Sequence, residues 1–305
     1  MTPSRMHPDE LDIDEALVRR LLETQFPQWA NLPLHRVQSD GTDNAIFRLG
    51  DALSVRLPRI GWATGQVDKE YEWLPRLAPH VPLTIPVPIV RGMPGDGYPW
   101  RWTVSPWLDG ENATADRIDL RQAAIDLAAF VTAMWKIDTT GGPEAGPDNF
   151  RRGVPLADRN ESVLNAIATV ASMDIGINTG LARDIWEDAL NQPVWGGDPV
   201  WLHGDIQHGN LLAVDGRITS IIDFGCLGIG DPAADLTVAW TLLDAESRAI
   251  FRERVGVDDA TWVRARGLAV AFALGVLTYY LATNPTLTSI AWHSIDQVFQ
   301  DVGDG

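Results

Sequence analysis

Two short polar motifs joined by a predicted hairpin constrain the fold of this chain more than any other feature. The first motif, His-Gly-Asp-Ile-Gln-His-Gly-Asn, occupies residues 203–210, and the second, Asp-Phe-Gly, occupies 223–225. Between them, two apolar runs flank an Asp-Gly pair at 215–216, the strongest short-range signal for a β-hairpin. Because a hairpin returns its second end beside its first, we expect Asn210 and Asp223 to lie next to each other.

The two motifs contain the groups that phosphoryl transfer from a nucleoside triphosphate requires, namely a base for the acceptor and oxygen ligands for Mg²⁺. Asp205 is the expected catalytic base, which accepts or orients the proton of the attacking hydroxyl. Asn210 and Asp223 are the expected metal ligands, because Mg²⁺ prefers oxygen atoms. The alternative is that these residues only form turns. Both motifs at this separation, on a predicted hairpin, favour an active site.

With these motifs the chain resembles the aminoglycoside phosphotransferase family, a branch of the protein-kinase-like fold that phosphorylates hydroxyls of small molecules. The family pattern reads H-G-D-x-x-x-x-N, then a hairpin, then D-x-[GE], and the order of other features agrees from about residue 35 onward. The resemblance implies an α+β, two-lobed fold. A small, mostly antiparallel β-sheet lobe would span residues 1–104, a connector 105–110, and a larger, mainly helical lobe with the catalytic hairpin loops 111–305.

The smaller expected lobe contains a candidate cation for the nucleotide phosphates. Alternating runs at 44–49 and 52–57, joined by Gly-Asp, predict a second hairpin. Arg56 lies where the resemblance places a phosphate-pairing lysine, whereas the two lysines of the chain, Lys69 and Lys136, are not on predicted strands. Arginine stays charged and offers phosphate a bidentate fork, so the exchange is chemically reasonable.

Several neighbours complete the expected nucleotide site. Glu70 on the following predicted helix is the expected partner of Arg56, with Glu72 as second choice, and Arg59 is expected to be a solvated surface group. The turn before the first strand is a candidate phosphate cover, although as an isolated string it is an ordinary turn. In the resemblance, the nucleotide base bonds to the connector backbone. The candidates in these two segments are Gly41, Thr42 and Asn44, and Ser105 and Trp107.

Three polar residues around the motifs are assigned to structure. His203 follows Trp and Leu at an expected strand end, which is typical of a buried structural histidine. Asp231 precedes Pro232 and is a good helix N-cap. Asp235 would follow in the first turn of that helix, and the alternative for it is a contact with a substrate ammonium group.

Composition narrows the class of partner. A formal net charge of −17 argues against nucleic acid, suits a cationic small substrate, and is also consistent with acidity that only maintains solubility. The single cysteine, Cys226, excludes an intramolecular disulfide and fits a reducing, cytoplasmic location. The acidic N-terminal residues predict no signal peptide, and the apolar stretch 267–282 is short for a membrane span, so we expect a buried helix and no membrane partner.

The expected activity is Mg²⁺-dependent transfer of the γ-phosphoryl group of ATP or GTP to a hydroxyl of a small cationic molecule. An aminoglycoside or another antibiotic is the first candidate acceptor, with resistance by inactivation as the consequence. Two alternatives stay open: a kinase of a small metabolite of the choline, homoserine or sugar type, and a non-catalytic nucleotide-binding module marked by Arg56 in place of lysine. The intact set of Asp205, Asn210 and Asp223 argues against the second alternative, because a protein that only binds needs no base.

Overall fold

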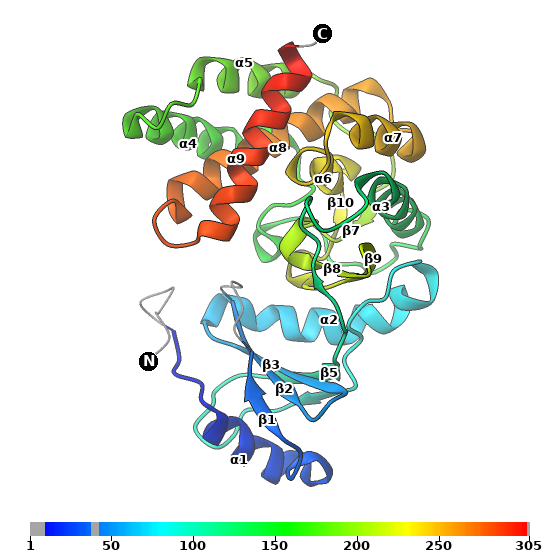
Figure 1. Ribbon diagram of the computed structural model, residues 1–305, viewed down its shortest axis with the longest axis vertical. Helices are drawn as coiled ribbons and strands as arrows, with labels where there is room; N and C mark the ends of the chain where they lie inside the picture. The colour runs from blue at the N-terminus through cyan, green and yellow to red at the C-terminus, as the bar shows by residue number, and fades with distance from the viewer. Residues whose placement is uncertain (1–9, 38–42, 304–305) are drawn as a thin grey trace. The chain divides into compact units, whose positions relative to one another are not determined.

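A computed structural model describes residues 10–37 and 43–303, and the chain divides into two compact units (Figure 1). The first unit contains the residues up to Pro79 together with Thr84–Asp109. The second contains His80–Leu83 together with Gly110–Gly305. Apart from the short segment His80–Leu83, the boundary between the units falls between Asp109 and Gly110.

The first unit is built on a five-stranded antiparallel sheet in the order β1-β2-β3-β5-β4. β2 and β3 form the hairpin expected from the alternating runs, with Leu49 paired to Leu53 across the turn. β5 (Trp102–Pro106) continues through Pro106, so the first two residues of the expected connector, Ser105 and Pro106, belong to the sheet. The strands are β1 (Leu34–Arg36), β2 (Asn44–Leu49), β3 (Leu53–Pro58), β4 (Val90–Gly92) and β5 (Trp102–Pro106).

Two helices pack on opposite faces of this sheet (Figure 1). α1 (Glu15–Gln25) begins at Asp14, whose carboxylate accepts a hydrogen bond from a backbone N–H of the first turn, and it buries its apolar side against the sheet. Because side chains alternate along a strand, Val55 and Leu57 share that core while Arg56 points to the other face. α2 (Thr64–Leu77) supplies the partner of Arg56 on that face.

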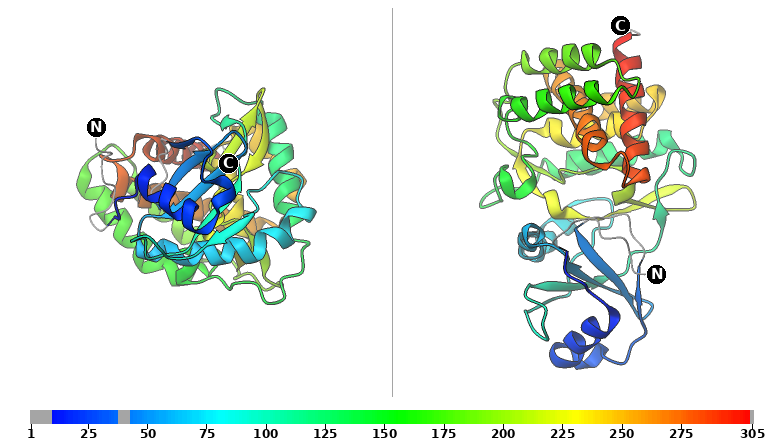
Figure 2. Two further views of the ribbon diagram at one scale, coloured as in Figure 1. Left: turned by 90° about the horizontal axis from the view of Figure 1, so that it is seen from below. Right: turned by 90° about the vertical axis from the view of Figure 1, so that its left-hand side faces the viewer.

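Helices dominate the second unit, and α8 (Asp259–Tyr280) forms its centre by packing against α4 (Asn160–Met173), α5 (Thr179–Leu190) and α9 (Pro285–Gly303) (Figure 2). Among the described residues, α8 is the one helix long and apolar enough to cross a membrane, but 72% of its apolar window is buried within the protein. The expectation of a buried core helix is therefore confirmed. The remaining helices are α3 (Leu120–Met134), α6 (Val238–Thr241) and α7 (Ala245–Val255).

Short strands in the second unit hold the two polar motifs. β8 (Leu211–Val214) and β9 (Arg217–Ile221) form the expected hairpin, and β6 (Glu111–Asn112) pairs with the other edge of β8. Asp215 and Gly216 at the hairpin tip have φ angles of 49° and 77°, as a type I′ turn requires. β7 (Val200–Leu202) and β10 (Gly228–Gly230) form a separate antiparallel pair.

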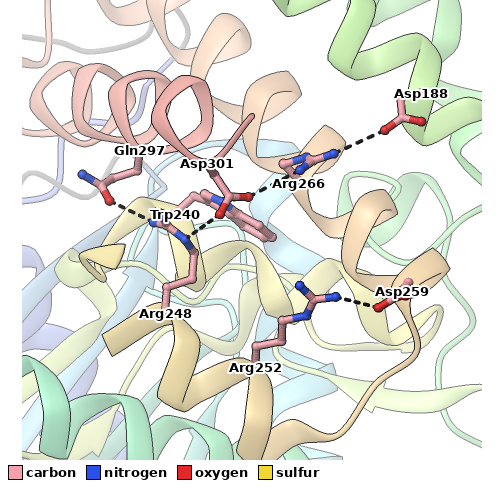
Figure 3. A network of polar contacts seen from close by, with 8 residues as sticks. All are labelled: Asp188, Trp240, Arg248, Arg252, Asp259, Arg266, Gln297 and Asp301. Carbon is pink, nitrogen blue, oxygen red and sulfur yellow. Dashed lines mark hydrogen bonds and ion pairs between the residues drawn. The ribbon is translucent and has the colours of Figure 1, made fainter. Parts of the chain in front are cut away.

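The carboxylate of Asp301 ties α9 to three other helices (Figure 3). It lies 3.3 Å from Arg248 Nε of α7 and 3.5 Å from Arg266 Nη1 of α8, and it accepts a hydrogen bond from Trp240 Nε1 of α6 at 3.4 Å. Only 5% of the Arg248 side chain is exposed, so its charge depends on Asp301 for compensation. By contrast, the Arg252–Asp259 pair in the same view lies at the surface, with 93% of the Asp259 side chain exposed.

Asp301→Asn should therefore lower the free energy of unfolding by about 2–4 kcal/mol, because removing one partner of a buried ion pair leaves an uncompensated charge. Asp259→Asn is the matched control, with an expected loss of about 1 kcal/mol or less, since exposed ion pairs contribute little. Urea denaturation of both variants measures the difference. Equal losses would show that Asp301 does not anchor α9.

Candidate active site

His203 connects the first polar motif to the second. It follows β7 and is fully buried. Its Nδ1 atom accepts the backbone N–H of Asp205 at 3.2 Å, and Nε2 lies 3.1 Å from the carbonyl oxygen of Ile222. Nε2 therefore carries the proton, since it must donate to that carbonyl. Burial lowers the pKa of His203, against the opposing charge of Asp235, so the neutral ring holds both loops together.

Asp235 fixes the backbone at the start of the first polar motif, residues 203–210. It lies on the 3₁₀ helix Pro232–Thr237 and is fully buried. Its two oxygens accept the backbone N–H groups of His203 at 2.8 Å and Gly204 at 2.7 Å. Gly204 has a φ of +83°, and a Cβ there would lie 2.6 Å from a backbone oxygen of Cys226. Asp235 is thus a structural residue, because it is fully buried and both of its oxygens bind the backbone.

Asp205 and Asn210 are held together by hydrogen bonds. Asn210 Nδ2 donates to the Asp205 carbonyl oxygen and to Asp205 Oδ2, both at 2.9 Å. The same amide leaves its oxygen, Oδ1, available to a cation. Gln207 accepts the backbone N–H of Gly209 through its Oε1 at 2.8 Å, which fixes the intervening turn.

The hairpin returns Asp223 to Asn210, as the sequence predicts. Leu211 pairs with Ile221, and the N–H of Ile222 donates to the Asn210 carbonyl at 2.8 Å. Asp223 follows immediately with a φ of 65°, a left-handed conformation that non-glycine residues adopt uncommonly and often at functional sites. Two oxygen donors, one from each motif, therefore lie at the base of one hairpin.

The electrostatic environment of Asp205 is set by burial and by neighbouring charges. Burial raises the pKa of its carboxyl group, the guanidinium of Arg152 opposes this rise, and the charge of Asp223 adds to it. Arg152 Nη2 lies 3.9 Å from Asp205 Oδ1. Sequence reasoning missed Arg152, which lies 53 residues before Asp205 in a stretch with no recognisable motif, Asn-Phe-Arg-Arg-Gly at 149–153.

The donor set fits Mg²⁺ but not a metal bound mainly by histidine or cysteine. Among residues 10–37 and 43–303, no group of three or more His, Cys, Asp or Glu is arranged to hold a metal ion. An amide oxygen of Asn210 with a carboxylate of Asp223 is the kind of sparse, all-oxygen set that Mg²⁺ uses when substrate phosphates and water complete its shell.

In the first unit, Arg56 is paired with Glu70. Arg56 Nη1 lies 2.6 Å and 2.7 Å from the two Glu70 oxygens, and 17% and 5% of the two side chains are exposed. Asn44, with its amide oriented so that both atoms are satisfied, accepts from Arg56 Nη2 at 2.9 Å and Nε at 3.1 Å. Glu72, the second choice, instead pairs with Arg76.

The remaining candidates of the first unit have different outcomes. Gly41 and Thr42 lie outside the described residues. Ser105 is buried within β5. The backbone N–H of Trp107 donates to the carbonyl of Ala52, and the guanidinium of Arg48 lies over the Trp107 ring. The expectation that Arg59 is a solvated surface group is wrong, because its side chain is buried at the end of the sheet. Arg59 directly follows β3, so the sequence suggested a surface turn. Only the fold shows that its side chain is covered.

The sequence pattern that defines the phosphotransferase enzyme family matches residues 35–268 of this chain. The chain belongs to the phosphotransferase enzyme family. It is a small-molecule phosphotransferase, as its motifs suggested.

Relatives of this phosphotransferase agree in fold. Aminoglycoside 3'-phosphotransferase of Escherichia coli is 28% identical over 209 residues, covering 66% of this chain and 73% of that protein. The GDP and kanamycin complex of APH(2")-IIia superposes with a TM-score of 0.68 at 19% identity, covering 94% of this chain and 99% of the other. Macrolide 2'-phosphotransferase MphH from Brachybacterium faecium gives 0.62 at 21% identity, with 93% and 98% covered. The expected α+β, kinase-like fold is confirmed.

The structural role of Asp235 in this phosphotransferase is open to a direct test. Asp235→Asn should lower the free energy of unfolding by about 2–4 kcal/mol, because one amide cannot accept two buried backbone N–H groups as the carboxylate does. Chemical denaturation measures the loss. Asp184→Asn, an exposed change on α5, is the control and should be nearly neutral. A comparable effect of the two changes would contradict the role given to Asp235.

Proposed function

We propose that this phosphotransferase transfers the γ-phosphoryl group of ATP or GTP to a hydroxyl of a small molecule, with Asp205 as the base. The observation that supports this most is the bonding of Asp205 to Asn210 beside the hairpin that returns Asp223. A carboxylate held by a neighbouring amide, next to two oxygen donors, has the composition that phosphoryl transfer needs.

Asp205 acts on the acceptor. Asn210 and the backbone N–H of Asp205 itself, bonded to His203, hold the carboxylate in one orientation. An acceptor hydroxyl that donates to this carboxylate has its oxygen lone pair directed at the phosphorus, and its proton passes to Asp205 as the new bond forms. The raised pKa of the carboxyl group makes it a better proton acceptor than an ordinary aspartate.

Asn210 Oδ1 and the carboxylate of Asp223 would hold Mg²⁺. When bound, the ion neutralises charge on the phosphate oxygens. His203 holds together the two backbone segments that carry these residues, through its bonds to the N–H of Asp205 and the carbonyl of Ile222. In the first unit, Arg56, oriented by Glu70 and Asn44, is the proposed contact to the nucleotide phosphates.

Aminoglycosides and other antibiotics are the first acceptors to test, because the relatives include an aminoglycoside 3'-phosphotransferase and a kanamycin complex. Both ATP and GTP are supported as donors, because one solved relative is bound to GDP and another to ADP. Hydroxylated metabolites are the second class of acceptor. A non-catalytic nucleotide-binding module is the remaining alternative, and the cytoplasm is the proposed location.

Asp205→Asn should reduce turnover by about 10²–10⁴-fold with the fold intact, because an asparagine can still accept the hydrogen bond of Asn210 but cannot take a proton. The measurement is nucleotide consumption with Mg²⁺ and ATP or GTP across aminoglycosides, macrolides and hydroxylated metabolites. Asp184→Asn serves again as the control. Nucleotide binding without turnover on any acceptor would favour the non-catalytic module, and full activity of the Asp205 variant would exclude its role as base.

Arg56→Ala should raise the dissociation constant of ATP or GTP at least about tenfold, because a charge-assisted contact to phosphate is lost. Arg56→Lys should recover part of the affinity, since it restores the charge without the bidentate fork. Arg20→Ala, an exposed change on α1, is the control. Thermal unfolding separates folding from binding: a lower melting temperature with an unchanged dissociation constant would assign Arg56 to structure alone.

A further inference from the structure

Arg152 lies 3.9 Å from Asp205 in the second unit, two further arginines lie near Arg152, and the reaction described above uses none of the three. Arg151 and Arg152 lie in the loop before α4, and Arg159 lies immediately before the first residue of that helix. Burial, followed by the charges of Arg152 and Arg151, lowers the pKa of Arg159 to about 9. The three guanidinium groups are therefore close enough to repel one another.

Few acceptors within the protein satisfy this cluster. Among the described residues, Arg159 has no carboxylate partner, and the buried Nε of Arg152 has no hydrogen-bond acceptor. Arg152 is only 3.9 Å from Asp205, a loose contact, and Arg151 reaches a backbone carbonyl of Asp158 at 3.4 Å. Arg151 is exposed and the other two are partly buried, with 21% of the Arg152 side chain exposed. Partly buried cations with few partners are costly, so such a cluster suits a site that an anion completes.

The loop that carries the cluster is built to hold its shape. Asn149 is buried, accepts the N–H of Gly146 at 2.9 Å and donates to the Arg152 carbonyl at 2.8 Å. Phe150 and Arg151 both adopt left-handed backbone conformations, with φ angles of 54° and 58°. Such conformations are unfavourable for residues other than glycine and persist where the surrounding contacts enforce them, frequently at binding sites.

We propose that Arg151, Arg152 and Arg159 form a subsite for an anionic group, carboxylate or phosphate, on the acceptor whose hydroxyl Asp205 activates. This inference rests on the proposed function and narrows its acceptor class. The net charge of the whole chain suits a cationic acceptor. A charge as close to Asp205 as that of Arg152, however, acts on the acceptor more strongly than charges spread over the surface, because salt screens the distant ones. The subsite therefore selects hydroxylated anions over polycationic aminoglycosides.

Binding can be tested without turnover by titrating inorganic phosphate in a calorimeter, at low ionic strength and without nucleotide or Mg²⁺. Wild type should bind saturably, and Arg159→Gln and Arg152→Gln should each weaken binding at least about tenfold, as expected for loss of a charge-assisted contact. Arg183→Gln, the same change at an exposed position of α5, should leave binding unaltered. Absence of saturable binding, equal loss in the control, or loss only in Arg56→Ala would overturn the subsite.

Kinetics then identify the source of the anion. Hydroxy acids and sugar phosphates should be phosphorylated with kcat/KM at least about tenfold above that of their neutral counterparts, and Arg159→Gln should raise the acceptor KM alone. A rise in the nucleotide KM alone would assign the cluster to the transferred phosphoryl group and overturn the acceptor assignment. Turnover of aminoglycosides but of no hydroxylated anion would overturn it too, while leaving the proposed function intact. Phosphate binding at the cluster with no turnover of any acceptor would support the subsite and contradict the proposed function.

Discussion

The second unit depends on one buried hydrogen-bonded group, in which the Asp235 carboxylate accepts two consecutive backbone N–H groups and the neutral ring of His203 joins the two polar motifs. His203 and Asp235 are fully buried, and the two bonds that Asp235 accepts are removed from water, so a missing partner there would be costly. The arrangement leaves Gly204 in a conformation and a space that only glycine fits. Asp205 is thereby held on a rigid support, as the role of base proposed for it requires.

The cation beside Asp205 is opposite in sign to the charge of the protein as a whole. The chain carries a formal net charge of −17, yet Arg152 lies 3.9 Å from this carboxylate and has Arg151 and Arg159 as neighbours. Net charge affects solubility and long-range attraction, whereas recognition depends on groups within a few ångströms. The net charge therefore favours a cationic acceptor, whereas the local arginines favour an anionic one. The local arginines are the stronger physical argument.

Sequence reasoning succeeded where the signals were local. The Asp-Gly turn predicted the hairpin that brings Asn210 to Ile222, and strand alternation separated Arg56 from the apolar face of its sheet. It failed for Arg59, because the burial of a residue at a strand end depends on what lies over it. It also missed Arg152, because no periodicity or spacing relates an irregular loop to a motif 53 residues further along the chain.

By itself, the sequence determined the motifs, their order and the turn between them, since these depend on residue type and on backbone preferences over a few positions. That information was sufficient to indicate the family and the reaction. The tertiary structure confirmed Glu70 as the expected partner of Arg56. It alone showed that Asp235 binds the backbone of the first motif and that Arg152 lies beside Asp205. Such contacts join distant segments, and they form only when the apolar faces of helices and strands have packed, which no local pattern encodes.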